Sequence, residues 1–250
     1  MTFKELQERL DYPLTRKQWH THPKGGGWVQ NTASVEESAM VGITAVVCND
    51  AIVTDRAAIL GNAIVENAAR VGDNARVTHW ARVSDNAKVY GSAVITDHAR
   101  VYECAKVYGD AHVREHSRVY GDAEIYEYAN IGGNAIVYNE AKVYGNAFLN
   151  DTCTITDTAC VLGNAVVMGE TILAEGFHTK TPLMIWGSRF PIVHVKKGFV
   201  QIGCTTNSIN WWLNSRDAIA LAKELRFKKG EIEEYREHIK YIQKIERKEK

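Results

Sequence analysis

Arginine and tyrosine recur at intervals of eighteen residues in the middle of the chain, which is the first indication of a binding site. The arginine column comprises Arg82, Arg100 and Arg118. A second series begins two positions after Arg82 and has the same interval; it consists of Ser84, Tyr102, Tyr120 and Tyr138. We call its three aromatic residues the tyrosine column. Guanidinium groups brought side by side repel one another unless acids or a bound anion relieve the repulsion. Aromatic rings beside them could stack on a planar ligand.

A second basic series has the same interval but other positions. It consists of Arg70, Lys88, Lys106 and Lys142, with Glu124 in the place of one base, and its tyrosines are Tyr90, Tyr108, Tyr126 and Tyr144. Both series suit a nucleotide or another anionic aromatic molecule. The alternative is that the ladders only cover a flat sheet and keep it soluble. The candidate ligand-binding residues are the arginine column, the tyrosine column, Lys88, Lys106, Tyr90 and Tyr108.

Histidines are the candidates for catalysis, because an imidazole can act as a general base on a hydroxyl or an amine. His98 and His116 are one interval apart, and His79 lies one interval earlier, offset by one residue. Three histidines at one corner would also suggest zinc. Exposed turn histidines are the default interpretation, and we expect no metal.

These columns depend on a repeat of six residues. From Val29 to Leu173 every sixth residue is aliphatic, and a second series at the same interval, from Ala33 to Thr171, is alanine except at Ser117, Cys153 and Thr171. A period of six fits neither a helix nor a simple strand, but it fits a solenoid in which each short strand contributes one inward side chain. Three hexads make one triangular coil, so about eight coils are expected between residues 29 and 174. Glycine, asparagine and aspartate between the hexads tolerate the left-handed backbone of tight corners.

This pattern resembles the hexapeptide repeat of left-handed β-helix proteins, a family that includes many acyltransferases and the γ-class carbonic anhydrases. The resemblance implies a left-handed parallel β-helix and a homotrimer. For an acyltransferase it would imply coenzyme A or acetyl-coenzyme A as cofactor and His98 or His116 as base. The repeats carry no inserted loop of the kind that encloses the substrates of those enzymes. The segments HPKGGGWV at residues 22–29 and IGC at residues 202–204 are similar to uncharacterised hexapeptide proteins often encoded by phages and prophages.

The remaining segments are expected to cover the ends of the solenoid, which otherwise expose apolar side chains and unpaired backbone. Residues 1–28 are expected to form a helix over residues 3–10 and a cap. Residues 175–206 are expected to form a short β-rich cap with strands at 183–186, 192–195 and 199–202. Residues 207–250 read as helical, and the apolar face of their last helix holds Ile232, Tyr235, Ile239 and Ile242.

Composition limits the partners. The chain has 250 residues and a formal net charge of zero, so no overall field attracts nucleic acid or a membrane surface. Acids interspersed among the bases also argue against a continuous phosphate track, namely Glu103, Glu115, Glu124 and Glu127. The five cysteines have no paired spacing, and the N-terminus lacks the apolar run of a signal peptide, which favours the cytoplasm.

A third, more apolar face is expected to contact a partner subunit or the C-terminal segment; its residues are Ala58, Leu60, Val94, Thr96, Phe148, Val166 and Met168. The sequence therefore predicts an oligomeric, non-catalytic binding protein without a cofactor, whose partner is a small anionic ligand or a protein. The alternatives are a coenzyme A-dependent acyltransferase and a purely structural module.

Overall fold

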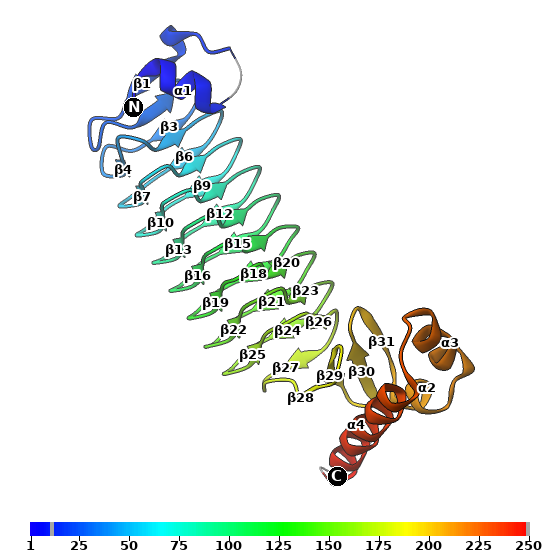
Figure 1. The fold of residues 1–250 in the computed structure, drawn as a ribbon. Coiled ribbons are helices and arrows are strands. Elements are labelled where there is room, and N and C mark those ends of the chain that lie inside the picture. The colour runs from blue at the N-terminus through cyan, green and yellow to red at the C-terminus, as the bar shows by residue number, and fades with distance from the viewer. Residues whose placement is uncertain (11–12, 249–250) are drawn as a thin grey trace.

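The computed structural model describes residues 1–10 and 13–248; residues 11–12 and 249–250, within the expected N-terminal cap and C-terminal helix, lie outside it. The described residues form a β-solenoid of stacked parallel coils with a capping element at each end (Figure 1). The expected fold class of about eight coils with an N-terminal cap and a C-terminal β plus helical cap is confirmed.

Three parallel sheets make the sides of the solenoid. The first sheet contains β2 (Trp28–Gln30), β5 (Val46–Val47), β8 (Ile64–Val65), β11 (Arg82–Val83), β14 (Arg100–Val101), β17 (Arg118–Val119), β20 (Ile136–Val137), β23 (Thr154–Ile155) and β26 (Ile172–Leu173). The second sheet contains β3 (Ser34–Val35), β6 (Ile52–Val53), β9 (Arg70–Val71), β12 (Lys88–Val89), β15 (Lys106–Val107), β18 (Glu124–Ile125), β21 (Lys142–Val143), β24 (Cys160–Val161) and β27 (Phe177–His178). The third sheet contains β4 (Met40–Val41), β7 (Ala58–Ile59), β10 (Arg76–Val77), β13 (Val94–Ile95), β16 (His112–Val113), β19 (Asn130–Ile131), β22 (Phe148–Leu149) and β25 (Val166–Val167).

Each two-residue strand turns its first side chain outward and its second inward, because successive side chains of a strand point to opposite faces. In β14, for example, Arg100 is exposed whereas Val101 is fully buried. The inward aliphatic residues stack from coil to coil, with alanine at the narrow corners between them. Burial of each such aliphatic side chain contributes about 1.5–3 kcal/mol, so this column of side chains is the main source of stability.

Many acidic residues of the solenoid lie at its corners. From Asn49 to Gly169 every sixth residue has a positive φ, a conformation that costs a residue other than glycine about 1–2 kcal/mol. Many corner side chains offset this cost by accepting a hydrogen bond from the backbone N–H of the equivalent corner one coil later. Asp85 accepts from the N–H of Glu103 at 3.2 Å, and Glu103 accepts from Gly121 at 2.9 Å. The same contact joins Asp97 to Glu115, Glu115 to Gly133, Glu127 to Gly145 and Asp151 to Gly169.

The N-terminal segment closes the first coil as expected. Its elements are α1 (Phe3–Leu10), the short helix η1 (Arg16–Gln18) and β1 (Trp19–Thr21). Strand β1 pairs antiparallel with β2 and so occupies the open edge of the first sheet. Helix α1 buries Leu6 against Trp28 and Val46, which are outward residues of that sheet. The exposed part of the first sheet therefore begins where α1 ends.

The C-terminal segment covers the last coil with an antiparallel sheet of β28 (Met184–Trp186), β29 (Pro191–Lys196), β30 (Phe199–Ile202) and β31 (Thr205–Ser208). Val193 and Val195 of β29 join the solenoid core. The side-chain oxygen of Gln201 accepts from the N–H of Ile172 at 2.7 Å, which caps the edge of β26. The helical pattern was expected from residue 207, but β31 extends to Ser208 because Thr205–Ser208 completes the hairpin with β30.

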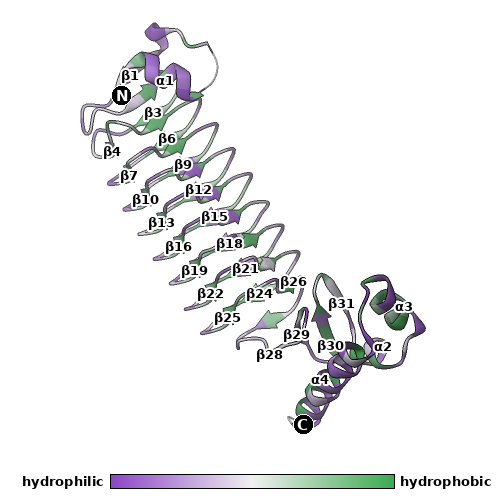
Figure 2. Ribbon diagram, viewed as in Figure 1, coloured by the Kyte–Doolittle hydropathy of each residue, from purple (hydrophilic) through white to green (hydrophobic). Residues whose placement is uncertain are grey.

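Three helices follow, namely α2 (Ile209–Asn214), α3 (Arg216–Glu224) and α4 (Lys229–Lys248). Hydrophobic and hydrophilic residues alternate on α3 and α4 (Figure 2). Helix α4 buries Tyr235, Ile239 and Ile242 in a separate core with Ile192 and Val200. The predicted apolar face thus packs on the chain's own C-terminal sheet. None of the described helices has both the length and the apolar character that crossing a membrane requires.

Candidate functional site

The arginine column exists as predicted. Arg82 pairs in register with Arg100, and Arg100 with Arg118, across β11, β14 and β17. The column is bounded by Ile64 on one side and Ile136 on the other. All three arginines are exposed on the first sheet, immediately after the part that α1 covers.

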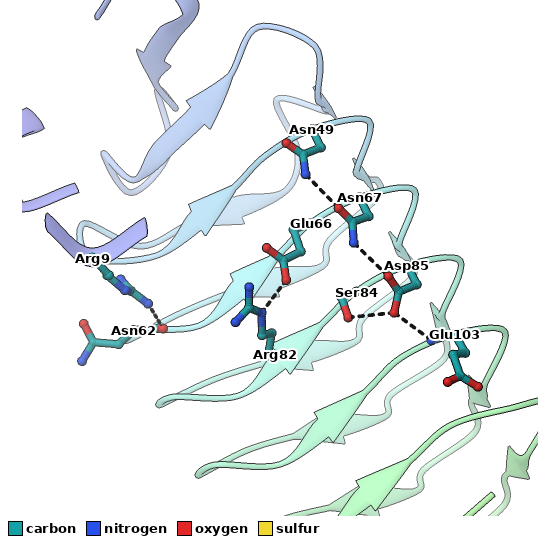
Figure 3. A network of polar contacts seen from close by, with 9 residues as sticks. All are labelled: Arg9, Asn49, Asn62, Glu66, Asn67, Arg82, Ser84, Asp85 and Glu103. Atoms are coloured by element: carbon teal, nitrogen blue, oxygen red, sulfur yellow. Dashed lines mark hydrogen bonds and ion pairs between the residues drawn. The ribbon is translucent and has the colours of Figure 1, made fainter. Parts of the chain in front are cut away.

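The three guanidinium groups differ in their partners. Arg82 forms an ion pair with Glu66, whose carboxylate raises the pKa of Arg82 (Figure 3). Within the described part of the chain, Arg100 and Arg118 have no carboxylate at ion-pair distance. Two neighbouring positive charges are thus left for solvent or for a ligand.

The tyrosine column is a continuous stack. The ring centroids of Tyr102 and Tyr120 are 4.8 Å apart with an interplanar angle of 11°, and those of Tyr120 and Tyr138 are 5.0 Å apart with an angle of 12°. Partial burial is the main cause that raises the pKa of Tyr102 and of Tyr120, and the neighbouring phenol adds to it. These phenols therefore keep their protons at neutral pH.

A surface hollow of about 300 Å³ lies where the arginine and tyrosine columns meet. Its lining residues are Glu66, Asn67, Arg82, Ser84, Asp85, Arg100, Tyr102 and Arg118. Asp85 is held in place because it accepts hydrogen bonds from Asn67 at 2.9 Å and from Ser84 at 3.3 Å (Figure 3). The volume is at the lower end of the range for small-molecule sites. Three guanidinium groups against two carboxylates leave the hollow net positive.

A third column runs on the opposite side of the arginines. The rings of Trp80 and His98 stack with centroids 6.4 Å apart, and those of His98 and His116 stack at 4.9 Å. Each lies two positions before an arginine of the column. The guanidinium of Arg9, at the end of α1, lies 5.8 Å from the Trp80 ring centroid and also donates to the backbone oxygen of Asn62 (Figure 3). The arginine column is therefore flanked by aromatic rings on both sides.

His79 does not join the other two histidines. It occupies a corner, with a φ of 58°, and its Nδ1 atom lies 2.8 Å from the hydroxyl of Thr96. Among the described residues, no group of three or more histidine, cysteine, aspartate or glutamate side chains could hold a metal ion. The role of His98 or His116 as a general base stays a prediction.

The second basic series is in register on the second sheet, and a carboxylate compensates two of its four bases. Glu124 lies between Lys106 and Lys142 and pairs with both, at 2.8 Å and 3.4 Å. The lysine contacts lower the pKa of Glu124. Tyr108, Tyr126 and Tyr144 stack with centroids 5.0 Å and 4.7 Å apart.

Two other candidate residues of the second basic series, Lys88 and Tyr90, lie one coil before Lys106 and Tyr108. Lys88 pairs in register with Lys106. The ring of Tyr90 packs beside Gly72, which has no side chain. Lys88, Lys106, Tyr90 and Tyr108 are not among the residues that line the hollow of about 300 Å³. The structure thus separates these four residues from the hollow at the arginine column.

The third sheet is less apolar than expected. The predicted residues Ala58, Val94, Phe148 and Val166 share it with Arg76 and His112. Arg114 lies beside it, with its guanidinium 5.8 Å from the Phe148 ring centroid. The C-terminal segment packs on the end of the solenoid, so this sheet is not its contact surface. The homotrimer stays a prediction.

Two further hollows have structural explanations. One of about 560 Å³ is lined partly by Glu36, Asp55 and Asp73, whose carboxylates already accept corner N–H groups of the following coil. Another, of about 120 Å³, lies inside the C-terminal unit between Trp212, Leu221 and other apolar side chains. Neither brings unpaired charged groups together.

Sequence reasoning missed Trp80, Glu66, Asn67 and Arg9. The first three could have been found, because Trp80 is one interval before His98, and Glu66 and Asn67 are one interval before Ser84 and Asp85. Arg9 lies outside the repeat, so no spacing in the sequence indicates where its guanidinium goes.

Comparison with known proteins supports the architecture. A family model described as the YdcK beta solenoid repeat matches residues 81–97, the segment that begins at the arginine column. No curated protein matches the chain in sequence. The chain is a β-helix repeat protein. Its closer likeness to hexapeptide enzymes or to phage proteins stays a prediction.

Proposed function

We propose that this protein is a non-catalytic binding protein for a small anionic ligand, which it holds on the arginine column. The observation that carries the proposal is the pair Arg100 and Arg118, which lie on adjacent coils without a carboxylate at ion-pair distance among the described residues. Two unit charges about 5 Å apart repel by about 3 kcal/mol at the effective dielectric constant of a protein surface. A phosphate or carboxylate between the two guanidinium groups turns this repulsion into attraction.

The geometry also supports this surface over the second sheet. There Glu124 already supplies the negative charge for Lys106 and Lys142. The other two bases of that series, Arg70 and Lys88, do not line the hollow of about 300 Å³ that Arg100 and Arg118 line. A guanidinium group presents a planar fork of donors that matches phosphate and carboxylate oxygens. The sheet already holds the backbones of both arginines in register, so only their side chains have to be ordered when an anion binds.

Titration calorimetry with pyrophosphate tests the proposal. The wild-type protein is expected to bind, with an affinity that falls as salt is added. Arg100→Ala is expected to lower the affinity by about 10-fold or more, because a charge-assisted hydrogen bond is worth about 1.5–3 kcal/mol.

Arg76→Ala is the matched control, because Arg76 is an exposed first residue of a strand on the third sheet, between Ala58 and Val94. It is expected to leave pyrophosphate binding unchanged. Absence of binding to the wild type, or an equal loss in both variants, would contradict the proposal.

The expected compartment belongs with this proposal. All five cysteines lie in the described part of the chain and are unpaired. Burial raises the pKa of Cys48 and of Cys153 to about 12, so these two thiols are unreactive. Free thiols suit a reducing compartment such as the cytoplasm.

A further inference from the structure

The faces of the stacked tyrosines are almost all occupied. Neighbouring ring centroids in the tyrosine column are only 4.8 Å and 5.0 Å apart. A planar ligand between two rings needs about 7 Å, twice the contact distance of about 3.5 Å between carbon atoms. No ligand ring can therefore enter the column, and only the outer faces of its first and last rings, Tyr102 and Tyr138, are able to stack on one.

The outer face of Tyr102 is turned toward Ser84. Tyr120 covers one side of the Tyr102 ring, and Ser84 occupies the equivalent position on the coil at the other side, next to the Arg82–Arg100 register pair. Ser84 is short and donates its hydroxyl hydrogen to Asp85, so it leaves space above the ring. Ser84 and Tyr102 both line the hollow of about 300 Å³.

The other end of the column has different neighbours. Beyond Tyr138 lies Thr156, which is 5% exposed and bonded to the side chain of Asn139. The outward residues beside it are Ile136 and Thr154, which carry no charge. Only the Tyr102 end combines a free aromatic face with guanidinium groups.

We propose that this hollow binds a mononucleotide, with its base stacked on the outer face of Tyr102 above Ser84 and its phosphate held by Arg100 and Arg118. The inference rests on the proposed function and adds a planar ring to the anion. Since the column offers one free face beside the arginines, it accommodates one base. A single nucleotide therefore uses the whole of this face, and a second base gains no stacking on this end of the tyrosine column.

The test compares three probes by titration calorimetry: adenosine monophosphate, ribose phosphate and inorganic phosphate. Stacking of a base on an aromatic side chain is worth about 1–3 kcal/mol, which corresponds to about 5- to 140-fold in affinity. Wild-type protein is expected to bind adenosine monophosphate more tightly than ribose phosphate by a factor in this range. Ribose phosphate and inorganic phosphate are expected to bind with similar affinities.

Two variants locate the base. Ser84→Tyr continues the stack and covers the free face of Tyr102, so it is expected to remove the preference for adenosine monophosphate while ribose phosphate still binds. Tyr102→Leu removes the ring itself and is expected to lower the preference in the same way. Leu162→Tyr is the matched control, because it extends the other tyrosine stack beyond Tyr144, away from the arginines.

Equal wild-type affinities for adenosine monophosphate and ribose phosphate would overturn the inference and leave the proposed function intact. A preference that survives both Ser84→Tyr and Tyr102→Leu would also overturn it. Failure of all three probes and of pyrophosphate to bind the wild type would overturn both. Thermal unfolding of each variant shows whether it is folded, and the wild-type comparison decides the matter even if a variant is not.

Discussion

The corner contacts between coils lead to a prediction that can be worked out in detail for Glu103. This residue has a φ of 56°, and its carboxylate accepts the N–H of Gly121 at 2.9 Å. Replacing it by alanine removes the hydrogen bond but keeps the left-handed backbone with a Cβ atom. Replacing it by glycine removes the same hydrogen bond and also relieves the backbone.

The two substitutions are therefore expected to differ. Loss of the hydrogen bond costs about 1 kcal/mol at an exposed corner, where water can take the place of the carboxylate. Glycine adopts the left-handed backbone at a free-energy cost about 1 kcal/mol lower than that of alanine. Glu103→Ala is expected to lower the free energy of unfolding by about 1 kcal/mol, and Glu103→Gly is expected to stay near the wild type. For a chain of this size, 1 kcal/mol corresponds to about 2–4 °C in the melting temperature.

Thermal and urea-induced unfolding followed by circular dichroism measure both variants. Glu140→Ala is the control, because Glu140 is an exposed glutamate that directly follows the corner residue Asn139, and its loss removes the same charge. It is expected to have no effect beyond a few tenths of a kcal/mol. If the alanine and glycine variants of Glu103 lose equal stability, the backbone argument is wrong. If neither loses any, the carboxylate contact contributes nothing.

Two further predictions concern the second sheet. Ile125→Ala deletes a fully buried inward side chain and is expected to cost about 2–5 kcal/mol in urea-induced unfolding; a loss below about 1 kcal/mol would contradict the assignment of this column as the core. Hydrogen bonding to Lys106 is the main cause that lowers the pKa of Glu124. The ionised carboxylate therefore stabilises the folded protein at pH values above the pKa that Glu124 has in the unfolded chain. This stabilisation is lost as the pH falls through the lower pKa of the folded state. The test is urea-induced unfolding of the wild type and of Glu124→Gln between pH 7 and pH 3. The wild type is expected to be more stable at neutral pH, by less than about 1 kcal/mol because solvent screens the pair. The difference is expected to vanish in acid. A constant difference across this range would contradict the ion-pair explanation.

The register of the columns could be predicted from the sequence because the repeat is uninterrupted. Three hexads complete one coil, so residues eighteen apart become neighbours whatever their side chains are, and Arg82, Arg100 and Arg118 are aligned as expected. The tyrosine stacks depend on the same rule, since it brings equal rings to equal positions on adjacent coils, where they can meet face to face.

The partners of the charged groups could not be predicted in the same way. Glu103, Glu115 and Glu127 read in the sequence as charges that interrupt a basic surface, yet their carboxylates are bonded to backbone N–H groups of the next coil. Arg82 pairs with Glu66, sixteen residues earlier, which is not a repeat interval. A long side chain can reach several positions, and only the packing around it decides which one it takes.

The sequence alone determined the solenoid, its core and the alignment of its columns, because a period of six with small residues at the corners fits three-sided coils and neither a helix nor a simple strand. The tertiary structure decided which neighbouring bases line a hollow without a carboxylate partner, and which tyrosine face stays open. Those outcomes depend on Glu124 between two lysines, on α1 ending above the arginine column and on the short side chain of Ser84 beside Tyr102. Each outcome depends on the distances between side chains on different coils. The repeat brings these side chains close together but does not specify the distances.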